Sequence, residues 1–127
     1  MMANEWNEAA KRLIELTESG QMRWEQNRDL CRRREKDEEF VGPAYVTEYG
    51  GKRIAVYEYR YKQWLDAEKW DWERDVAVEF VDENFESEWT WPAPQRRGAL
   101  LESIQYQTSH ARQFLQAILA EHAPAST

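Results

Sequence analysis

Two adjacent glycines separate two runs of strand-forming residues near the middle of this chain. Residues 40–49 and 52–61 are rich in tyrosine and valine, and Gly50-Gly51 lies between them. Glycine tolerates the positive φ angles of a two-residue type I′ turn, so the arrangement predicts a β-hairpin. The turn also sets the register, which pairs Tyr49 with Lys52, Thr47 with Ile54 and Tyr45 with Val56. Both faces of this hairpin are substantially apolar, so we expect one face to be covered.

The residues on either side of the hairpin predict helices and further strands. Residues 5–19 have the apolar spacing of an amphipathic helix, with Asn4 as N-cap and Gly20 at the end. Residues 62–70 are expected to form a connection between strands, with a helical turn over 64–69. Apolar and polar residues alternate over 70–80 and 85–91, as they do in strands. Residues 97–122 predict one long amphipathic helix. The expected fold is α+β: an antiparallel sheet of about four strands, a meander of two hairpins, flanked by an N-terminal and a long C-terminal helix.

The length of 127 residues suits a single domain, 1–127, and a 42% hydrophobic content is enough for its core. Residues 1–4 and 123–127 are expected to be loose. Residues 27–39 are expected to be a charged segment, either a solvated helix or a mobile loop. The three arginines at 32–34 are followed at once by acidic residues, which favours a solvated segment over an anion-binding site.

Cysteine content, hydropathy and charge indicate where the protein works. Cys31 is the only cysteine, so the chain cannot form an intramolecular disulfide. The first residues lack the basic and apolar regions of a signal peptide, and no apolar run is long enough to span a membrane. The net charge of −7 argues against a nonspecific nucleic-acid binder, which needs a cationic face. We therefore expect a cytoplasmic protein that contacts neither membrane nor nucleic acid.

The order of these elements resembles a known kind of protein. The helix ending at Gly20, the Trp24-Glu25 pair, the hairpin and a final helix of the form Leu-Leu-Glu-x-Ile…Phe-Leu-x-x-Ile-Leu are similar to small uncharacterised bacterial cytosolic proteins. The resemblance extends over nearly the whole chain. It implies an α+β fold and implies no activity, cofactor or catalytic residue.

Motifs that carry catalytic chemistry do not occur in the sequence. There is no glycine-rich phosphate loop, no G-x-S-x-G and no H-E-x-x-H. His110 and His122 lie twelve residues apart, so on one helix they project about 120° apart and about 18 Å along the axis, too far to share a metal. Cys31 has no histidine near it in sequence to act as a base. We therefore expect no catalytic residue, cofactor site or metal ligand.

Tryptophan and carboxylate residues are concentrated together in the second half of the chain. Five of the seven tryptophans fall within 64–91, and residues 62–95 carry ten acidic against three basic side chains, a net charge of −7. A two-residue turn at Glu83-Asn84 would place Glu79 directly opposite Glu88, where like charges are destabilising. Three explanations stay open: a solvated acidic face, a face neutralised by a basic partner, or a site for a divalent cation or carboxylate chemistry.

We expect a non-catalytic protein-interaction module, immunity-like, inhibitor-like or accessory, that uses the acidic and aromatic 64–91 surface against a basic protein partner. The candidate interaction surface comprises Trp64, Trp70, Asp71, Asp75, Glu79, Glu86, Glu88 and Trp91. The alternative is a small enzyme or ligand-binding domain with a carboxylate and tryptophan cleft. Self-association through exposed aromatic residues is a third possibility, so the choice between monomer and homodimer is left open.

Overall fold

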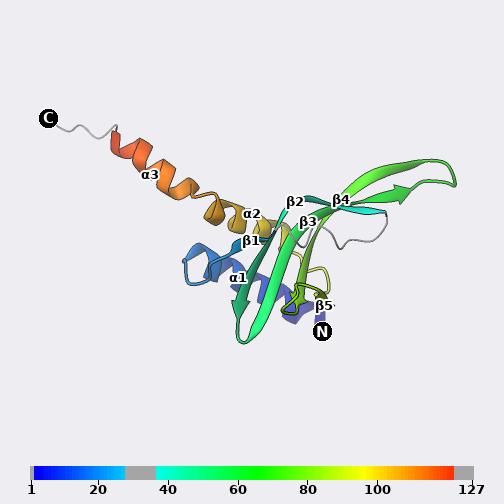
Figure 1. Ribbon diagram of the computed structural model, residues 1–127, viewed down its shortest axis with the longest axis horizontal. Coiled ribbons are helices and arrows are strands. Elements are labelled where there is room, and N and C mark those ends of the chain that lie inside the picture. The colour runs from blue at the N-terminus through cyan, green and yellow to red at the C-terminus, as the bar shows by residue number, and fades with distance from the viewer. Residues whose placement is uncertain (1, 28–36, 122–127) are drawn as a thin grey trace.

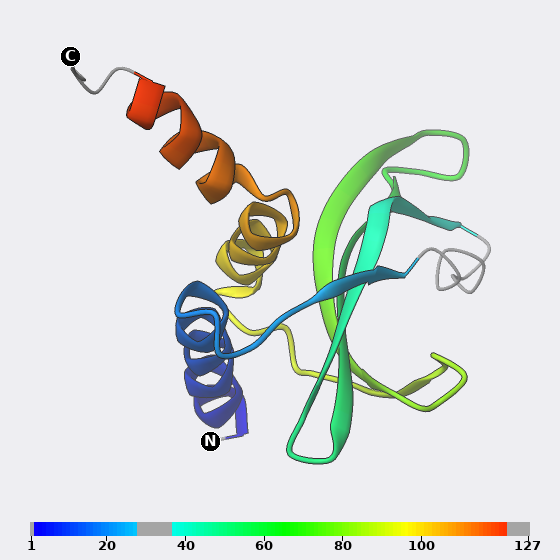
Figure 2. The ribbon, with the colours of Figure 1, turned by 60° about the vertical axis from the view of Figure 1, so that its left-hand side comes forward.

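The computed structural model describes residues 2–27 and 37–121. Over these residues the chain forms a five-stranded antiparallel sheet, with strands in chain order, and three helices (Figure 1). The strands are β1 (Glu25–Asn27), β2 (Glu38–Tyr49), β3 (Lys52–Trp64), β4 (Trp70–Val81) and β5 (Ser87–Thr90); the helices are α1 (Met2–Glu18), α2 (Arg97–Thr108) and α3 (Ala111–Glu121). Figure 2 shows α1 and α2 on one side of a curved sheet. The α+β class with an antiparallel meander is therefore confirmed.

The β2–β3 hairpin forms in the register that the two glycines predict. Tyr49 pairs with Lys52, and the pairing continues through Thr47 with Ile54 and Tyr45 with Val56. Gly50 and Gly51 have φ angles of 61° and 79°. A side chain would strain both positions, so this turn explains why the sequence places glycine there.

Two expectations about the strands need correction. The sheet has a fifth strand, the short β1, which pairs with residues 44–46 of β2. Residues 62–70 do not contain a helical turn over 64–69. Instead β3 continues to Trp64 and β4 begins at Trp70, directly opposite it. The extended pairing brings the rings of Trp64, Trp70 and Trp72 into contact on one face, and these contacts favour extension of the hairpin over a helical turn.

The register between β4 and β5 also differs from the expected one. Glu79 pairs with Thr90 rather than Glu88, and the register shifts between Phe80 and Val81. The connecting turn is longer than two residues, since the backbone N–H of Asp82 donates to the carbonyl oxygen of Glu86 at 2.9 Å. The Asp82 carboxylate stabilises this turn by accepting hydrogen bonds from the backbone N–H groups of Asn84 and Glu86. Phe85 has a φ angle of 64°, a left-handed conformation that the amino-acid type does not predict.

The main hydrophobic core lies between the sheet and the helices α1 and α2. Its buried side chains are Leu13, Leu16, Met22, Trp24, Tyr45, Ile54, Val56, Val78, Trp91, Leu100, Leu101 and Ile104. Gln107 of α2 closes one end of this core. Its amide Nε2 donates to the carbonyl oxygens of Thr17 and Met22, and its Oε1 accepts from the backbone N–H of Trp24. The amide therefore ties α2 to the end of α1 and to the segment that follows.

The other face of the sheet carries a second, smaller apolar cluster. Buried Ala44, Ala55, Tyr57, Ala77 and Val81 form it, with Phe40, Val46, Tyr59 and Phe85 packed against them. Successive strand residues point to opposite faces, so this set and the main core divide the strands between them by parity. Both faces are apolar as expected.

The C-terminal residues form two helices rather than the single long helix expected. The helix is interrupted at Ser109 and His110, and His110 has a φ angle of 59°. Hydroxyl groups favour this break, because Thr108 and Ser109 bond back to the carbonyl oxygens of Ile104 and Tyr106. The α3 helix buries none of its residues and extends away from the body of the protein.

The structure tests only part of what was expected of the chain ends and of the charged segment 27–39. α1 begins at Met2, so Asn4 lies inside the helix rather than at its N-cap. Asn27 ends β1, and Glu38 and Glu39 begin β2. Cys31, the arginines at 32–34, His122 and the tail 123–127 lie outside the described residues. No helix of the described chain is long and apolar enough to cross a membrane.

Candidate functional site

The distal ends of β3 and β4 form a two-stranded arm, residues 62–72, that extends past the rest of the sheet. Pairing of β2 with β3 stops at Glu38 and Tyr61, whereas β3 and β4 remain paired up to Trp64 and Trp70. In Figure 1 the arm is the long green hairpin at the opposite end of the molecule from α3. Its tip therefore lies away from the core.

The loop at the tip of the arm is fixed by its own hydrogen bonds. The backbone N–H of Leu65 donates to the carbonyl oxygen of Lys69 at 2.8 Å. The Asp66 carboxylate accepts from the N–H groups of Glu68 and Lys69 at 2.8 and 2.9 Å. An aspartate that binds the backbone in this way stabilises a tight turn. The tip can thus present side chains in a defined arrangement.

One face of the arm combines indole rings with cations. The Trp64 and Trp70 rings lie 6.3 Å apart, and those of Trp70 and Trp72 lie 5.1 Å apart. Lys62 Nζ is 4.6 Å from the Trp70 ring centre, and Arg60 Cζ is 4.2 Å from that of Trp72. These cation–π contacts hold the rings in place while leaving them in contact with water.

The tip itself is apolar and accessible. The exposed fractions are 49% for Trp64, 64% for Leu65 and 36% for Trp70. A buried tryptophan typically contributes 150–250 Å² of contact area, and tryptophan is enriched among the residues that dominate binding energy at interfaces. This tip thus has the composition of an anchor for a partner.

The opposite face of the arm carries carboxylates without a cation. Asp71 lies opposite Gln63, and Glu73, one pair further along, lies opposite Tyr61. Across residues 2–27 and 37–121, neither carboxylate forms an ion pair. The arm and the pairs at its base therefore have one face of indoles and cations and another of tyrosine and carboxylate groups.

Asp75 follows Glu73 at the base of the arm and is held within the protein. Its Oδ1 accepts a hydrogen bond from Arg97 Nε at 2.8 Å and another from the backbone N–H of Val76 at 2.7 Å. Arg97 is the first residue of α2. This carboxylate has a structural partner, in contrast to Asp71 and Glu73.

Two of the sequence-predicted surface residues, Glu79 and Trp91, lie in the interior. Trp91 is 5% exposed, and its ring centre lies 4.6 Å from that of Trp6 and 5.6 Å from that of Phe80. Glu79 is 6% exposed, and its Oε2 accepts a hydrogen bond from the Thr90 hydroxyl at 3.0 Å. The expected repulsion between Glu79 and Glu88 is absent because Thr90, not Glu88, is opposite Glu79.

The remaining two, Glu86 and Glu88, lie at the β4–β5 turn, at the other end of β4 from the arm. Glu88 forms an ion pair with Lys52 of β3 at 3.6 Å. The backbone of Glu86 bonds to Asp82 within the turn. The structure thus brings Trp64, Trp70 and Asp71 together on the arm, with Asp75 at its base, and separates them from the other four residues.

Sequence reasoning left Glu73, Leu65, Trp72 and the two cations Arg60 and Lys62 out of the candidate surface. Glu73 could have been included, since it alternates with Asp71 on a predicted strand. Leu65 and Lys62 were missed because the arm was expected to be a connection.

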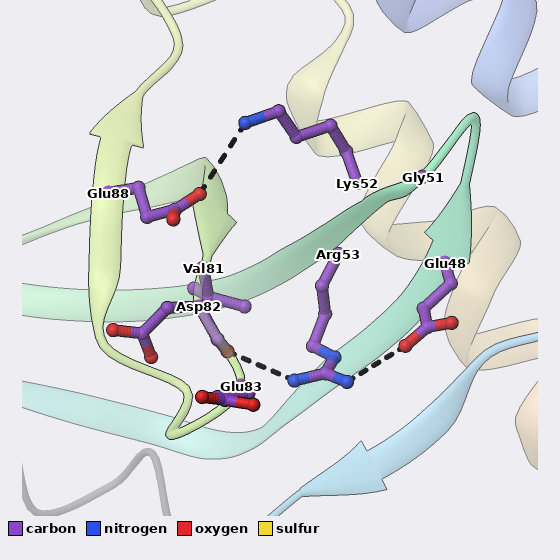
Figure 3. A pocket seen from close by; sticks show the side chains of 8 residues that line it. All are labelled: Glu48, Gly51, Lys52, Arg53, Val81, Asp82, Glu83 and Glu88. Carbon is purple, nitrogen blue, oxygen red and sulfur yellow. Dashed lines mark hydrogen bonds and ion pairs between the residues drawn. The ribbon is translucent and has the colours of Figure 1, made fainter.

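A hollow of about 390 Å³ lies between the β2–β3 and β4–β5 turns (Figure 3). Eight residues line it: Glu48, Gly51, Lys52, Arg53, Val81, Asp82, Glu83 and Glu88. Arg53 donates to the Glu48 carboxylate at 2.8 Å and to the Asp82 carbonyl oxygen at 3.1 Å. Lys52, the other cation of the hollow, forms an ion pair with Glu88. Both cations are thus already bonded, and no tryptophan lines the hollow. Within the described ranges, no three His, Cys, Asp or Glu side chains are grouped closely enough to hold a metal.

A second exposed apolar surface lies on α3. Phe114, Leu115, Ile118 and Leu119 recur at the spacing of one helix face and are all exposed, Phe114 by 70%. Nothing in the described part of the structure shows what would cover this face.

Nothing matched this chain in comparisons with protein-family models, with curated proteins and with solved structures. The resemblance to small bacterial proteins therefore stays a prediction. The geometry of the arm is the remaining guide to function.

Proposed function

We propose that this protein is a non-catalytic interaction module that binds a basic protein partner through its arm. The observation that carries the proposal is the position of Asp71 and Glu73. Both are exposed and lie beside the indole-rich tip, and neither forms an ion pair with another described residue. A cationic partner would supply the missing countercharge, and the exposed indoles would supply apolar contact area.

The class of function is the one expected from the sequence, but the proposed binding surface is smaller than the expected one and is limited to the arm. A charged projection of this kind suits an immunity-like or inhibitor-like protein, because charge complementarity favours specific and rapid contact. Attraction between opposite charges raises the rate of association and weakens as salt increases. We propose the cytoplasm as the compartment, since the single cysteine leaves the fold independent of an intramolecular disulfide.

Charge reversal on the arm tests the proposal. The test variant combines Asp71→Lys with Glu73→Lys, and the matched control combines Glu102→Lys with Glu121→Lys, two exposed acidic residues of the helices. Both variants change the net charge by the same amount. Each immobilised protein is used at low salt to capture proteins from a lysate of the cells that produce it.

We expect the wild type and the helix variant to retain the same basic protein, and the arm variant to lose it. Raising the salt concentration should release that protein from the wild type. Retention by all three proteins would contradict the proposal, and so would loss from both variants, because net charge rather than the arm would then determine binding.

A further inference from the structure

The outer edge of β4 is open along the arm. β5 pairs with β4 only from Glu79 to Val81, and the N–H of Trp91 then donates to the carbonyl oxygen of Val78 at 2.8 Å. Over residues 70–77, no strand of the described chain pairs with this edge. An open strand edge offers a row of backbone donors and acceptors.

The pairing pattern shows which backbone groups face outward. The N–H of Leu65 bonds to the carbonyl oxygen of Lys69, so this pair of odd-numbered residues is a hydrogen-bonded one. Such pairs alternate along an antiparallel ladder, so odd-numbered residues of β4 bond to β3 and even-numbered ones face away. Two observed bonds agree, because the N–H of Val76 and the carbonyl oxygen of Val78 both bond to groups outside β3. Trp70, Trp72 and Arg74 therefore present their backbone groups outward.

The chain itself covers the part of this edge that lies at the base of the arm. The Asp75 carboxylate accepts from the outward N–H of Val76, and Arg97 approaches from α2 to bind the same carboxylate oxygen. A cation thus already lies beside β4, against the carboxylate nearest the body. Asp71 and Glu73 are the next two carboxylates on the same face, and there the edge is open.

A second copy of the chain does not suit this edge. Two β4 strands pairing about a two-fold axis would keep odd-numbered residues opposite odd-numbered ones, because paired side chains share a face. In the register centred on Glu73, Glu73 would then face its own copy, and Asp71 would face Asp75 of the other copy. Like charges directly opposite one another are destabilising, so the acidic residues protect the edge from self-pairing.

We propose that residues 70–74 of β4 bind an extended segment of a partner protein as an added strand, with Lys or Arg at alternate positions facing Asp71 and Glu73. The residues between those cations would contact Trp70 and Trp72. Asp71 and Glu73 would occupy non-hydrogen-bonded positions of the new pair, where opposite side chains come closest. This inference rests on the proposed binding of a basic partner and adds how that partner is held.

Defined peptides test the inference with the full-length protein. The first probe is a capped peptide of about eight residues that alternates lysine and valine, long enough to pair with the open edge. A second peptide has the same composition with the lysines grouped together. A third has the alternating sequence with N-methyl groups on the valines, which removes the donors that would bond to β4. Binding is measured by titration calorimetry at low salt, and protection is measured by amide hydrogen exchange.

We expect the alternating peptide to bind and to slow exchange of the Trp70, Trp72 and Arg74 amides at least about tenfold. The Asp71 and Glu73 amides already bond to β3 and should not change. The N-methylated and grouped peptides should bind much more weakly. Combining Asp71→Asn with Glu73→Gln should weaken the alternating peptide roughly tenfold, whereas Glu102→Gln with Glu121→Gln should have no effect.

The results separate this inference from the proposed function. Equal binding of the grouped and alternating peptides without protection of the three amides would overturn the added strand, while a basic partner could still bind the arm through side chains. If no peptide binds and charge reversal on the arm leaves capture of the basic protein unchanged, both fail.

Discussion

Arg97 Nε lies 2.8 Å from Asp75 Oδ1, so the first residue of α2 is joined to the base of the arm. Arg97 Nη1 also donates to the carbonyl oxygen of Pro94 at 2.9 Å. The guanidinium thus links β4 to the loop that leads into α2. This contact closes the edge of β4 at the body of the protein and leaves it open beyond.

Removing the Arg97 guanidinium should lower the stability of the fold. We expect Arg97→Met to reduce the free energy of unfolding by about 1 kcal/mol, a modest value because both partners are partly solvated. Urea denaturation measures the change. Arg96→Met is the control, since Arg96 is exposed and its side chain forms no ion pair within the described chain. Equal effects of the two substitutions would show that the contact with Asp75 has no special role.

The buried Glu79 carboxylate should depend on the hydroxyl of Thr90. Thr90→Val keeps the shape of the side chain but removes the donor, so we expect a loss of about 1–2 kcal/mol in unfolding free energy. Thr90→Ser keeps the hydroxyl and should retain most of that stability. The two variants are compared by denaturant unfolding. Equal stability of the valine and serine variants would rule out the hydrogen bond as a source of stability.

The two C-terminal helices should differ sharply in their sensitivity to truncation. Leu100 of α2 is 0% exposed, whereas Leu119 of α3 is 60% exposed. We expect Leu100→Ala to cost about 2–5 kcal/mol and Leu119→Ala to stay within about 0.5 kcal/mol of the wild type. Thermal and urea unfolding measure both. A large loss for Leu119→Ala would mean that α3 packs against the body of the protein in solution.

The sequence predicted the β2–β3 hairpin because local chemistry determines that turn completely. Gly50 and Gly51 both need positive φ angles, and the two-residue loop then sets the pairs from Tyr49 with Lys52 to Tyr45 with Val56. Beyond them a shift between Val41 and Tyr45 changes the register. The apolar spacing over 5–19 similarly predicted an amphipathic helix, and Leu13 and Leu16 of α1 are in the main core.

Two of the remaining differences arise where a non-glycine residue adopts a left-handed conformation. Phe85 does so in the β4–β5 turn, which together with the shift between Phe80 and Val81 changes the register of Glu79, and His110 does so between α2 and α3. Phenylalanine gives no indication of this conformation, and histidine gives only a weak one, since it is enriched there among the non-glycine residues. The candidate surface was therefore only partly predictable. Trp64, Trp70 and Asp71 do lie together, while Glu79 and Trp91 lie in the interior because strand register and packing decide which side chains are buried.

Replacing the arm by a short turn shows directly whether the arm binds the basic partner. Tyr61 and Glu73 lie directly opposite one another as a hydrogen-bonded pair, so an Asn-Gly turn can join them in place of residues 62–72. The main core lies outside the removed residues. The shortened protein should therefore keep its circular dichroism spectrum and a cooperative unfolding transition. Binding of the basic partner is then compared with the wild type at low salt. We predict complete loss of binding by the folded, shortened protein; undiminished binding would mean that the partner binds elsewhere on the protein.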